Sequence, residues 1–232
     1  MFYPVNGNLT SMLFLIPAMI LAIYAQSKIK STYNIYSRER LRSGMSGAEV
    51  ARMVLDRSGL QNVSIERIPG NLTDHYDPRT KVLRLSDGVY GNATIASAGV
   101  AAHEAGHAIQ DQQSYAPLKL RAIMVPLASF GSRFAMILVM IGLFFASFKV
   151  LIDVGIILFS VVVLFQLITL PVEFNASHRA LAVLGDYQIL ASDEVPKAKK
   201  VLDAAALTYV AAAFSAIMTL VRLIYLRGRR RD

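Results

Sequence analysis

Residues 103–107 read His-Glu-Ala-Gly-His, and these residue types at this spacing are typical of a zinc peptidase site. On a helix, two histidines four residues apart lie on one face, so both imidazoles can bind one tetrahedral metal ion. Glu104 lies about 100° around the helix from His103, where its carboxylate can take a proton from a water and pass it to a leaving amine. The pattern predicts zinc ligands at His103 and His107 and a general base at Glu104.

The residues around the motif favour a metal site over a chance match or a buried structural histidine. Residues 94–102, TIASAGVAA, are small and apolar, and they predict a buried helix that leads into the motif. A His-Glu pair is costly to bury in such a helix without a metal or a partner. Gly106 costs about 1 kcal/mol relative to alanine in a helix interior, so it predicts close packing against another segment.

A catalytic zinc normally has a third protein ligand, and Glu173 is the best-placed candidate. It follows a predicted transmembrane hairpin, which would return it to the face of the membrane that carries the histidines. The alternative is a solvated carboxylate in the first turn of a helix that starts at Pro171. His178 is a rival ligand but points about 140° away from Glu173, which suits either a catalytic, substrate-facing role or a contact with one of the ligands. Ser177 shares the Glu173 face and could hydrogen-bond a ligand histidine.

Composition places the chain in a membrane. Of its 232 residues, 54% are hydrophobic, which is too many for a soluble enzyme of this size. Cysteine is absent, which excludes disulfides, thiolate ligands and a cysteine nucleophile. The net charge is +8, but the basic residues lie beside apolar runs, so we expect contact with anionic lipid headgroups of the bilayer and no nucleic-acid binding.

Hydropathy predicts five segments. They are an N-terminal transmembrane helix (1–25), a cytoplasmic zincin-like domain with the HEAGH helix (26–122), a transmembrane hairpin (123–170), a helix with the third zinc ligand and a loop (171–203), and a C-terminal membrane helix with a basic tail (204–232). Basic residues directly after the first apolar run place the next segment in the cytoplasm. If the chain starts outside the cell and crosses the membrane four times, its basic tail also lies outside. Either the positive-inside rule is then broken, or the last helix is interfacial or re-entrant.

Local patterns predict three elements in the cytoplasmic segment. Residues 46–59 are expected to form a helix, with a capping box between Ser46 and Glu49 and a stop at Gly59. Residues 63–68 and 81–86 alternate like strands and predict a two-stranded hairpin. Its second strand is either an edge that binds an extended peptide or a cover for the helix. The predicted substrate-binding residues are Lys81, Val82, Leu83, Arg84, Leu85 and Ser86.

Further candidates could stabilise an oxyanion. His75 or Tyr76 could donate a hydrogen bond from the turn before residues 81–86, although a turn closed by Asp77 explains the same residues. Tyr209 could act from the last helix, where it could equally be a packing position or an interface anchor.

Four segments in the same order carry a family resemblance: LTDHYDPRTKVLRLS, VAAHEAGHAIQ, PVEFNASHRA and AALTYVAAA. From about residue 44 to 218 they resemble the bacterial YugP-type neutral zinc metallopeptidases, and the pattern is similar to membrane gluzincins of the HtpX type, with HExxH and a later ExxxD. The resemblance implies Zn²⁺ bound by His103, His107 and Glu173, with Glu104 as base. Ser177 stands where the broader pattern has aspartate.

These observations predict an α+β, mainly helical fold, with a small minigluzincin domain and a short β-hairpin among about four transmembrane helices. The predicted function is a zinc metalloendopeptidase of the bacterial inner membrane, with its site facing the cytoplasm and a peptide or membrane protein as substrate. A second copy or a membrane accessory protein is a candidate partner. One alternative is an inactive zinc-binding adaptor, against which Glu104 argues; another is a transporter or channel, for which more intramembrane ionisable residues are expected.

Overall fold

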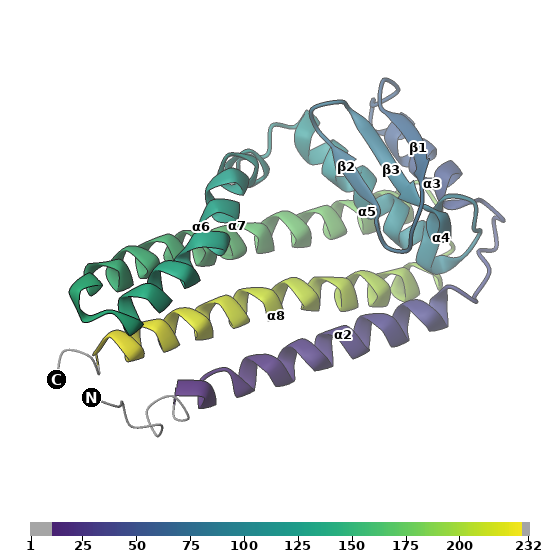
Figure 1. Cartoon of the computed structure of the whole chain (residues 1–232). Coiled ribbons are helices and arrows are strands. Elements are labelled where there is room, and N and C mark those ends of the chain that lie inside the picture. The colour runs from purple at the N-terminus through teal and green to yellow at the C-terminus, as the bar shows by residue number, and fades with distance from the viewer. Residues whose placement is uncertain (1–10, 229–232) are drawn as a thin grey trace. The chain divides into compact units, whose positions relative to one another are not determined.

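The structure is a computed structural model in which residues 11–228 are described. Its elements are α2 (Ile16–Tyr36), α3 (Gly47–Arg57), β1 (Ser64–Ile68), β2 (His75–Asp77), β3 (Val82–Ser86), α4 (Asp87–Tyr90), α5 (Ile95–Gln112), α6 (Ala116–Phe144), η1 (Ala146–Phe148), α7 (Val150–Asp186) and α8 (Val195–Gly228) (Figure 1). The first ten residues of the predicted N-terminal segment (1–25) and most of the basic tail lie outside the described residues.

The chain divides into two units. The helical unit comprises Leu120–Leu170 with the described parts of Met1–Gln26 and Thr208–Asp232, and the mixed unit comprises Ser27–Lys119 and Pro171–Leu207. Helices α2, α6, α7 and α8 each contribute residues to both units. Every residue of the proposed metal site lies in the mixed unit.

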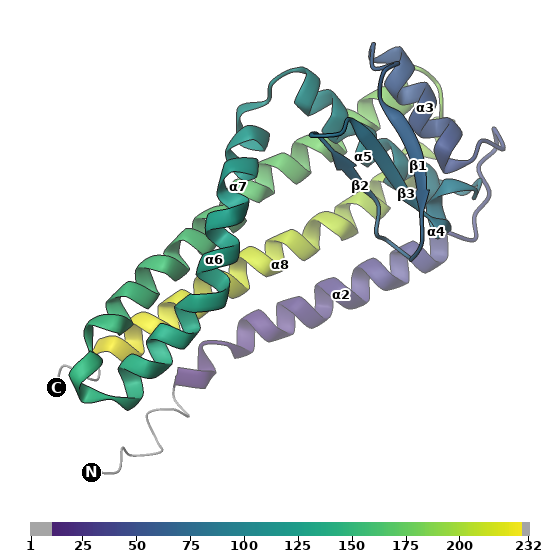
Figure 2. The ribbon, with the colours of Figure 1, turned by 45° about the horizontal axis from the view of Figure 1, so that its top comes forward.

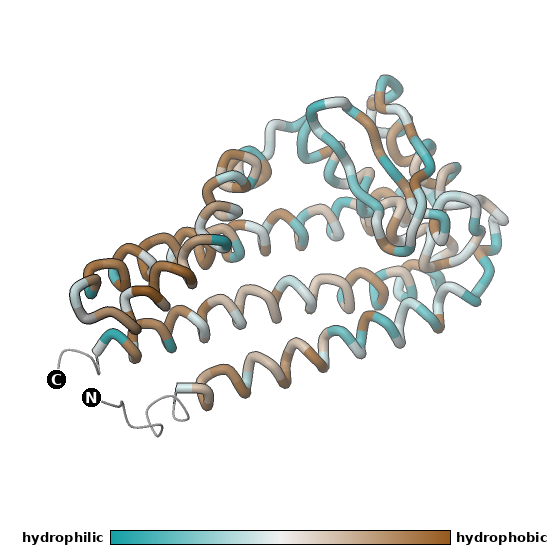
Figure 3. The backbone as a smooth tube through the Cα atoms, viewed as in Figure 1, coloured by the Kyte–Doolittle hydropathy of each residue, from teal (hydrophilic) through white to brown (hydrophobic). Residues whose placement is uncertain are grey.

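Four helices are long and apolar enough to cross a membrane: Ser11–Tyr36, Ala116–Phe144, Val150–Asp186 and Val195–Gly228. Hydrophobic residues dominate α6 and the first part of α7, drawn in brown in Figure 3. Within the helical unit these two helices approach closely at glycines, since a Cβ on Gly131 would lie 2.7 Å from the Leu158 carbonyl oxygen. Small residues at such contacts are typical of membrane helix pairs. The prediction of about four helices able to span a membrane is confirmed by their length and composition.

The sheet of the mixed unit has three strands in the order β1-β3-β2. β1 pairs with β3 in parallel, from Ser64 opposite Val82 to Ile68 opposite Ser86, and β2 pairs with β3 in antiparallel fashion. The predicted hairpin between residues 63–68 and 81–86 is therefore wrong, because those strands run in the same direction. A hairpin exists, but it joins β3 to β2, which lies in the predicted turn. Alternation indicates a strand, whereas the connection decides its direction.

Helices α3 and α5 cover one face of this sheet (Figure 2). The capping box of α3 is confirmed, because the Ser46 N–H donates to Glu49 Oε2 at 2.7 Å and the Glu49 N–H donates to Ser46 Oγ at 3.3 Å. Gly59, with φ +74°, follows the end of α3 as predicted. The shared core combines apolar residues of both helices and of β3: Val50, Val54, Leu55, Leu83, Leu85, Ile95, Ala98 and Ala102.

Helix α5 is buried along most of its length, as predicted from its small residues. Its N-cap is Thr94, whose Oγ1 accepts from the Ser97 N–H at 3.2 Å. The predicted helix start at Pro171 is wrong, because α7 runs without interruption from Val150 through Pro171 to Asp186. A proline lacks one backbone donor, a loss that long membrane-type helices tolerate when neighbouring groups compensate. Glu173 is therefore an interior residue of α7 and not a first-turn carboxylate.

Candidate metal centre

Two helices of the mixed unit bring three ligand-type side chains together. Helix α5 supplies His103 and His107, and α7 supplies Glu173; one ligand atom from each lies within 4.8 Å of the other two. Glu173 is only 2% exposed, His107 is buried and His103 is partly buried. The structure therefore places Glu173 beside both histidines of the motif, seventy residues from His103 in the sequence.

The distances suit a tetrahedral metal ion. Glu173 Oε2 lies 3.2 Å from His103 Nε2 and 3.6 Å from His107 Nε2. Ligands bound to zinc at about 2.0–2.1 Å are separated from one another by roughly 3.3–3.4 Å in a tetrahedron. Two imidazole nitrogens and one carboxylate oxygen are also a common ligand set of catalytic zinc. The three residues could thus hold a zinc ion with little rearrangement.

A glycine allows this approach of α5 and α7. A Cβ on Gly106 would lie 2.6 Å from the backbone oxygen of Ala176, well inside any normal contact. Only glycine therefore permits the observed spacing, and Ala176 is three residues from Glu173. The close packing predicted from Gly106 is confirmed.

Each histidine has a neighbour on its second ring nitrogen. His103 Nδ1 lies 3.1 Å from Ser177 Oγ, the contact proposed from the shared helix face of Ser177 and Glu173. His107 Nδ1 lies 3.0 Å from Gln110 Oε1. In both cases Nε2 is left to face Glu173. Partners of this kind orient a ligand imidazole and raise its basicity.

Gln110 was missed by sequence reasoning, although it is fully buried and contacts His107. Its amide nitrogen donates to the Val172 carbonyl at 2.8 Å and to Asn175 Oδ1 at 3.0 Å. Gln110 could have been found from its position three residues after His107, because side chains three residues apart are neighbours on one face of a helix.

The electrostatics of the site favour a positive charge. Burial lowers the pKa of His107, but the hydrogen bond with Glu173 and the charges of Glu104 and Glu173 outweigh burial, and the pKa is raised. Two carboxylates thus act on one buried imidazole. The same field would stabilise a bound cation.

Glu104 is half-buried on α5 next to the cluster. Its charge acts on His107, and within residues 11–228 it makes no hydrogen bond or ion pair. Its carboxylate is therefore not committed to another side chain of the described protein. A carboxylate without such a commitment is available to exchange a proton with a bound molecule.

The structure places the remaining candidates on β2, α7 and α8. His75 is exposed, and its Nδ1 lies 2.9 Å from the Thr73 carbonyl oxygen of its own turn. Burial and a 2.8 Å hydrogen bond to Asp111 raise the pKa of Tyr76. His178 is exposed on α7 and does not belong to the ligand group. Tyr209 lies in the part of α8 that belongs to the helical unit.

The prediction that residues 81–86 form an edge strand is wrong. β3 lies between β1 and β2, and both of its backbone edges are paired with these strands. Neither edge is therefore free to pair with a substrate. Its buried members are Val82, Leu83, Leu85 and Ser86. Arg84 makes an ion pair with Glu66, and Lys81 makes one with Asp111. A central strand of this kind offers no unpaired backbone edge to an extended peptide.

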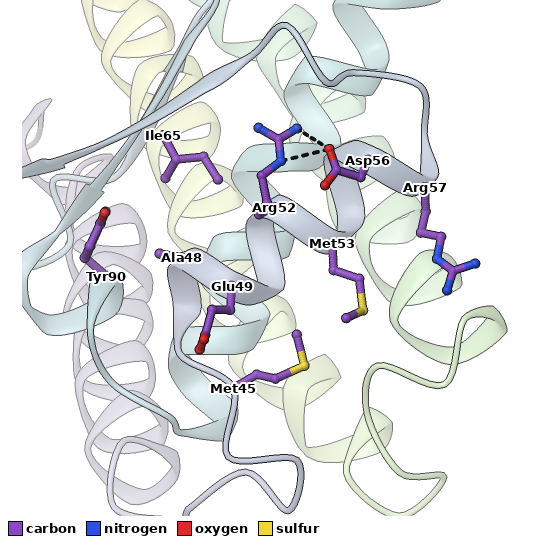
Figure 4. Close-up of a pocket in the computed structure, with 9 residues that line it drawn as sticks. All are labelled: Met45, Ala48, Glu49, Arg52, Met53, Asp56, Arg57, Ile65 and Tyr90. Atoms are coloured by element: carbon purple, nitrogen blue, oxygen red, sulfur yellow. Dashed lines mark hydrogen bonds and ion pairs between the residues drawn. The ribbon is translucent and has the colours of Figure 1, made fainter.

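A groove of about 790 Å³ lies elsewhere in the mixed unit (Figure 4). Its lining comes from α3 and the residues around it, and includes none of the ligand group: Met45, Ala48, Glu49, Arg52, Met53, Asp56, Arg57, Ile65 and Tyr90. Arg52 and Asp56 neutralise each other across one wall, with a 2.8 Å ion pair. Sequence reasoning did not predict this groove.

Comparison with known proteins places this site in a family. Residues 11–228 match the family described as "Putative neutral zinc metallopeptidase", and the chain belongs to that family. The predicted resemblance is confirmed. The family description implies zinc, for which His103, His107 and Glu173 form a suitable group.

One named relative is similar to this chain over almost its whole length. The chain is 48% identical over 216 residues to the "Putative membrane protease YugP" of Bacillus subtilis (strain 168), covering 92% of this chain and 96% of that protein. No solved structure matches the chain. The relative is described as a membrane protease, which agrees with the four apolar helices found here.

Proposed function

We propose that this chain is a membrane-embedded zinc metalloendopeptidase in which His103, His107 and Glu173 bind zinc and Glu104 is the general base. The observation that carries the proposal is the buried ligand group itself, with Glu104 beside it and free of other polar contacts within the described residues. A structural zinc site has no need for a half-buried, uncommitted carboxylate. This feature favours an enzyme over an inactive zinc-binding adaptor.

We infer a zincin-type arrangement of the minigluzincin kind for the mixed unit. It has a small sheet, a helix with both histidines and a second helix with the glutamate. Ser177 occupies the place four residues after Glu173 where the wider pattern has aspartate, and its hydroxyl contacts His103 Nδ1.

The proposed chemistry is direct attack of water on a peptide carbonyl. Bound zinc would polarise the carbonyl and lower the pKa of the attacking water. Glu104 accepts the proton from that water and later gives it to the leaving amine. Ser177 and Gln110 hold the two imidazoles so that neither swings away from Glu173.

The substrate segment is proposed to pair with β2, since β3 is not an edge. β2 is an outer strand of the sheet, and Tyr76 within it contacts Asp111, one helical turn after His107. An extended peptide added at this edge would gain main-chain hydrogen bonds and run beside α5. His75 and Tyr76 would then lie close to the substrate.

We propose that the protein lies in the bacterial inner (cytoplasmic) membrane, with its site on the cytoplasmic side. Lys28 and Lys30 are followed by Arg38, Arg40 and Arg42, and such basic residues next to an apolar helix favour the cytoplasmic face. A site that takes one ligand from α7, a helix long and apolar enough to cross a membrane, suits peptides or membrane proteins as substrates. A second copy or a membrane accessory protein is a proposed partner.

The test compares wild type with Glu104→Gln and Glu173→Ala in detergent, by metal analysis and by hydrolysis of a fluorescently labelled unfolded polypeptide. We expect about one zinc per chain in the wild type and in Glu104→Gln, and little in Glu173→Ala. Hydrolysis should require both carboxylates. Hydrolysis by Glu104→Gln at the wild-type rate would refute the assignment of the base, and zinc-loaded wild type without any hydrolysis would favour the adaptor.

A further inference from the structure

A series of polar side chains in contact with one another connects His107 to Arg179. Gln110 contacts His107 with its oxygen and Asn175 with its nitrogen, and Asn175 in turn contacts Arg179. Helix α5 supplies the first two residues, and α7 supplies the other two. Asn175 and Arg179 have no role in the chemistry described above, and Gln110 enters it only through its contact with His107.

Arg179 determines which way the Asn175 amide points. Its Nε donates to Asn175 Oδ1 at 2.6 Å, and its Nη1 donates to Gln113 Oε1 at 2.5 Å. A guanidinium carries only donors and stays charged at all relevant pH values. Asn175 must therefore turn its oxygen toward Arg179, because its NH₂ group would oppose donor to donor.

The direction of Asn175 then determines the direction of Gln110. The Gln110 amide lies near the Val172 carbonyl and Asn175 Oδ1, both of which can only accept hydrogen bonds. Its NH₂ group has two hydrogens for these two acceptors. Because Gln110 is fully buried, the reverse orientation would leave three acceptor oxygens facing one another without water, which is costly.

Gln110 Oε1 is consequently the atom that faces His107 Nδ1, at 3.0 Å. An amide oxygen cannot donate, so Nδ1 must carry the hydrogen. The neutral imidazole then has its lone pair on Nε2, the atom that faces Glu173. His103 differs, because its neighbour Ser177 is a hydroxyl that can donate or accept.

We propose that Arg179, Asn175 and Gln110 form a tautomer relay, which holds His107 with its proton on Nδ1 and its Nε2 lone pair aimed at the metal position. The three are positioning residues, and the inference rests on the proposed function in that the ligand is zinc. The relay prepares His107 as a ligand before any metal arrives. Loss of such an orienting partner typically weakens metal binding about 10–100-fold.

The experiment exploits a matched pair at one position. Asn175→Asp keeps an oxygen that accepts from both Arg179 and Gln110, whereas Asn175→Leu removes it at similar size. Zinc affinity is measured on the full chain in detergent by competition with a chelator. We expect Asn175→Asp to bind zinc like the wild type and Asn175→Leu to bind it about 10–100-fold more weakly.

A second readout does not depend on metal. The chain has four histidines, so NMR of protein with isotope-labelled histidine can report the tautomer of His107 without zinc, at alkaline pH where the imidazole is neutral. The wild type and Asn175→Asp should hold the hydrogen on Nδ1, and Asn175→Leu should show a mixture of both tautomers. Arg179→Lys and Arg179→Met repeat the comparison at a half-buried position, in case Asn175→Leu does not fold.

The control is Gln112→Leu, because Gln112 lies on the same helix but donates to the Ser58 carbonyl, away from the relay. Gln110→Leu should lose zinc affinity and Gln112→Leu should not. Equal zinc affinity and an unchanged tautomer in Asn175→Leu or Arg179→Met would overturn the relay. A wild type that binds no zinc would instead overturn the proposed function, while the tautomer measurement would still decide the relay.

Discussion

Substitution of Gly106 by alanine tests whether the approach of α5 to α7 builds the metal site. The added Cβ would lie 2.6 Å from the carbonyl oxygen of Ala176 and 3.2 Å from its carbonyl carbon. Non-bonded heavy atoms are comfortable at roughly 3.5 Å, so the helices must separate locally by roughly 0.9 Å. The obstacle is backbone in a helix interior and cannot rotate away.

Such a separation would disturb binding more than folding. Alanine gains about 1 kcal/mol over glycine in helix propensity, and overpacking costs about 1–3 kcal/mol, so the free energy of unfolding should fall by at most about 2 kcal/mol. Functional groups need to be held within about 0.5 Å of their working positions. Glu173 lies on α7 near the point of contact, and we therefore expect zinc affinity to fall about 10–100-fold or more.

Gly99→Ala is the matched control on the same helix. A Cβ there would lie 3.6 Å from the Ala198 Cβ, an ordinary contact, so this variant should gain up to about 1 kcal/mol and keep its zinc affinity. Chelator competition gives the affinity, and thermal unfolding in detergent gives the stability. If Gly106→Ala bound zinc as tightly as the wild type, the spacing of α5 and α7 would not be what positions Glu173.

Three further predictions concern substitutions of single side chains. Glu104→Gln should retain zinc and lose hydrolysis, whereas Glu173→Ala should lose both, as metal analysis and a peptidase assay on the same samples will show. Ser46→Ala should lower the free energy of unfolding by about 1 kcal/mol, measured by thermal unfolding, because it removes the N-cap hydroxyl of α3. Asp111→Asn should lower the pKa of Tyr76, so that tyrosinate absorbance appears at lower pH than in the wild type; a Tyr76→Phe background should abolish the difference.

Several features could be predicted because they depend on residues close in sequence. The two histidines and Glu104 lie within five residues on one helix, so their spacing alone places them around one ion position. The capping box of α3 involves residues three apart, and the four apolar helices follow from runs of hydrophobic residues. Gly106 also signalled a close contact, although it did not name the partner.

Other features depend on contacts between distant segments and could not be predicted. Alternation identified residues 63–68 and 81–86 as strands, but only the path of the connecting chain made them parallel neighbours with β2 on the far side of β3. The same path moved β3 from the sheet edge, where a substrate could bind, to its centre. Whether two strands pair in parallel or antiparallel fashion depends on both strands and cannot be predicted from either one alone.

By itself, the sequence determined the placement of His103, Glu104 and His107 on one helix, the apolar helices and the zinc peptidase family. Only the tertiary structure decided what surrounds that chemistry. It brought Glu173 and Ser177 to the histidines through the contact of Gly106 with Ala176, and it joined Gln110 to Asn175 across the two helices. The physical reason is range: helix periodicity and capping act over a few residues, whereas a ligand set and its hydrogen-bonded support form only where distant backbones pack against each other.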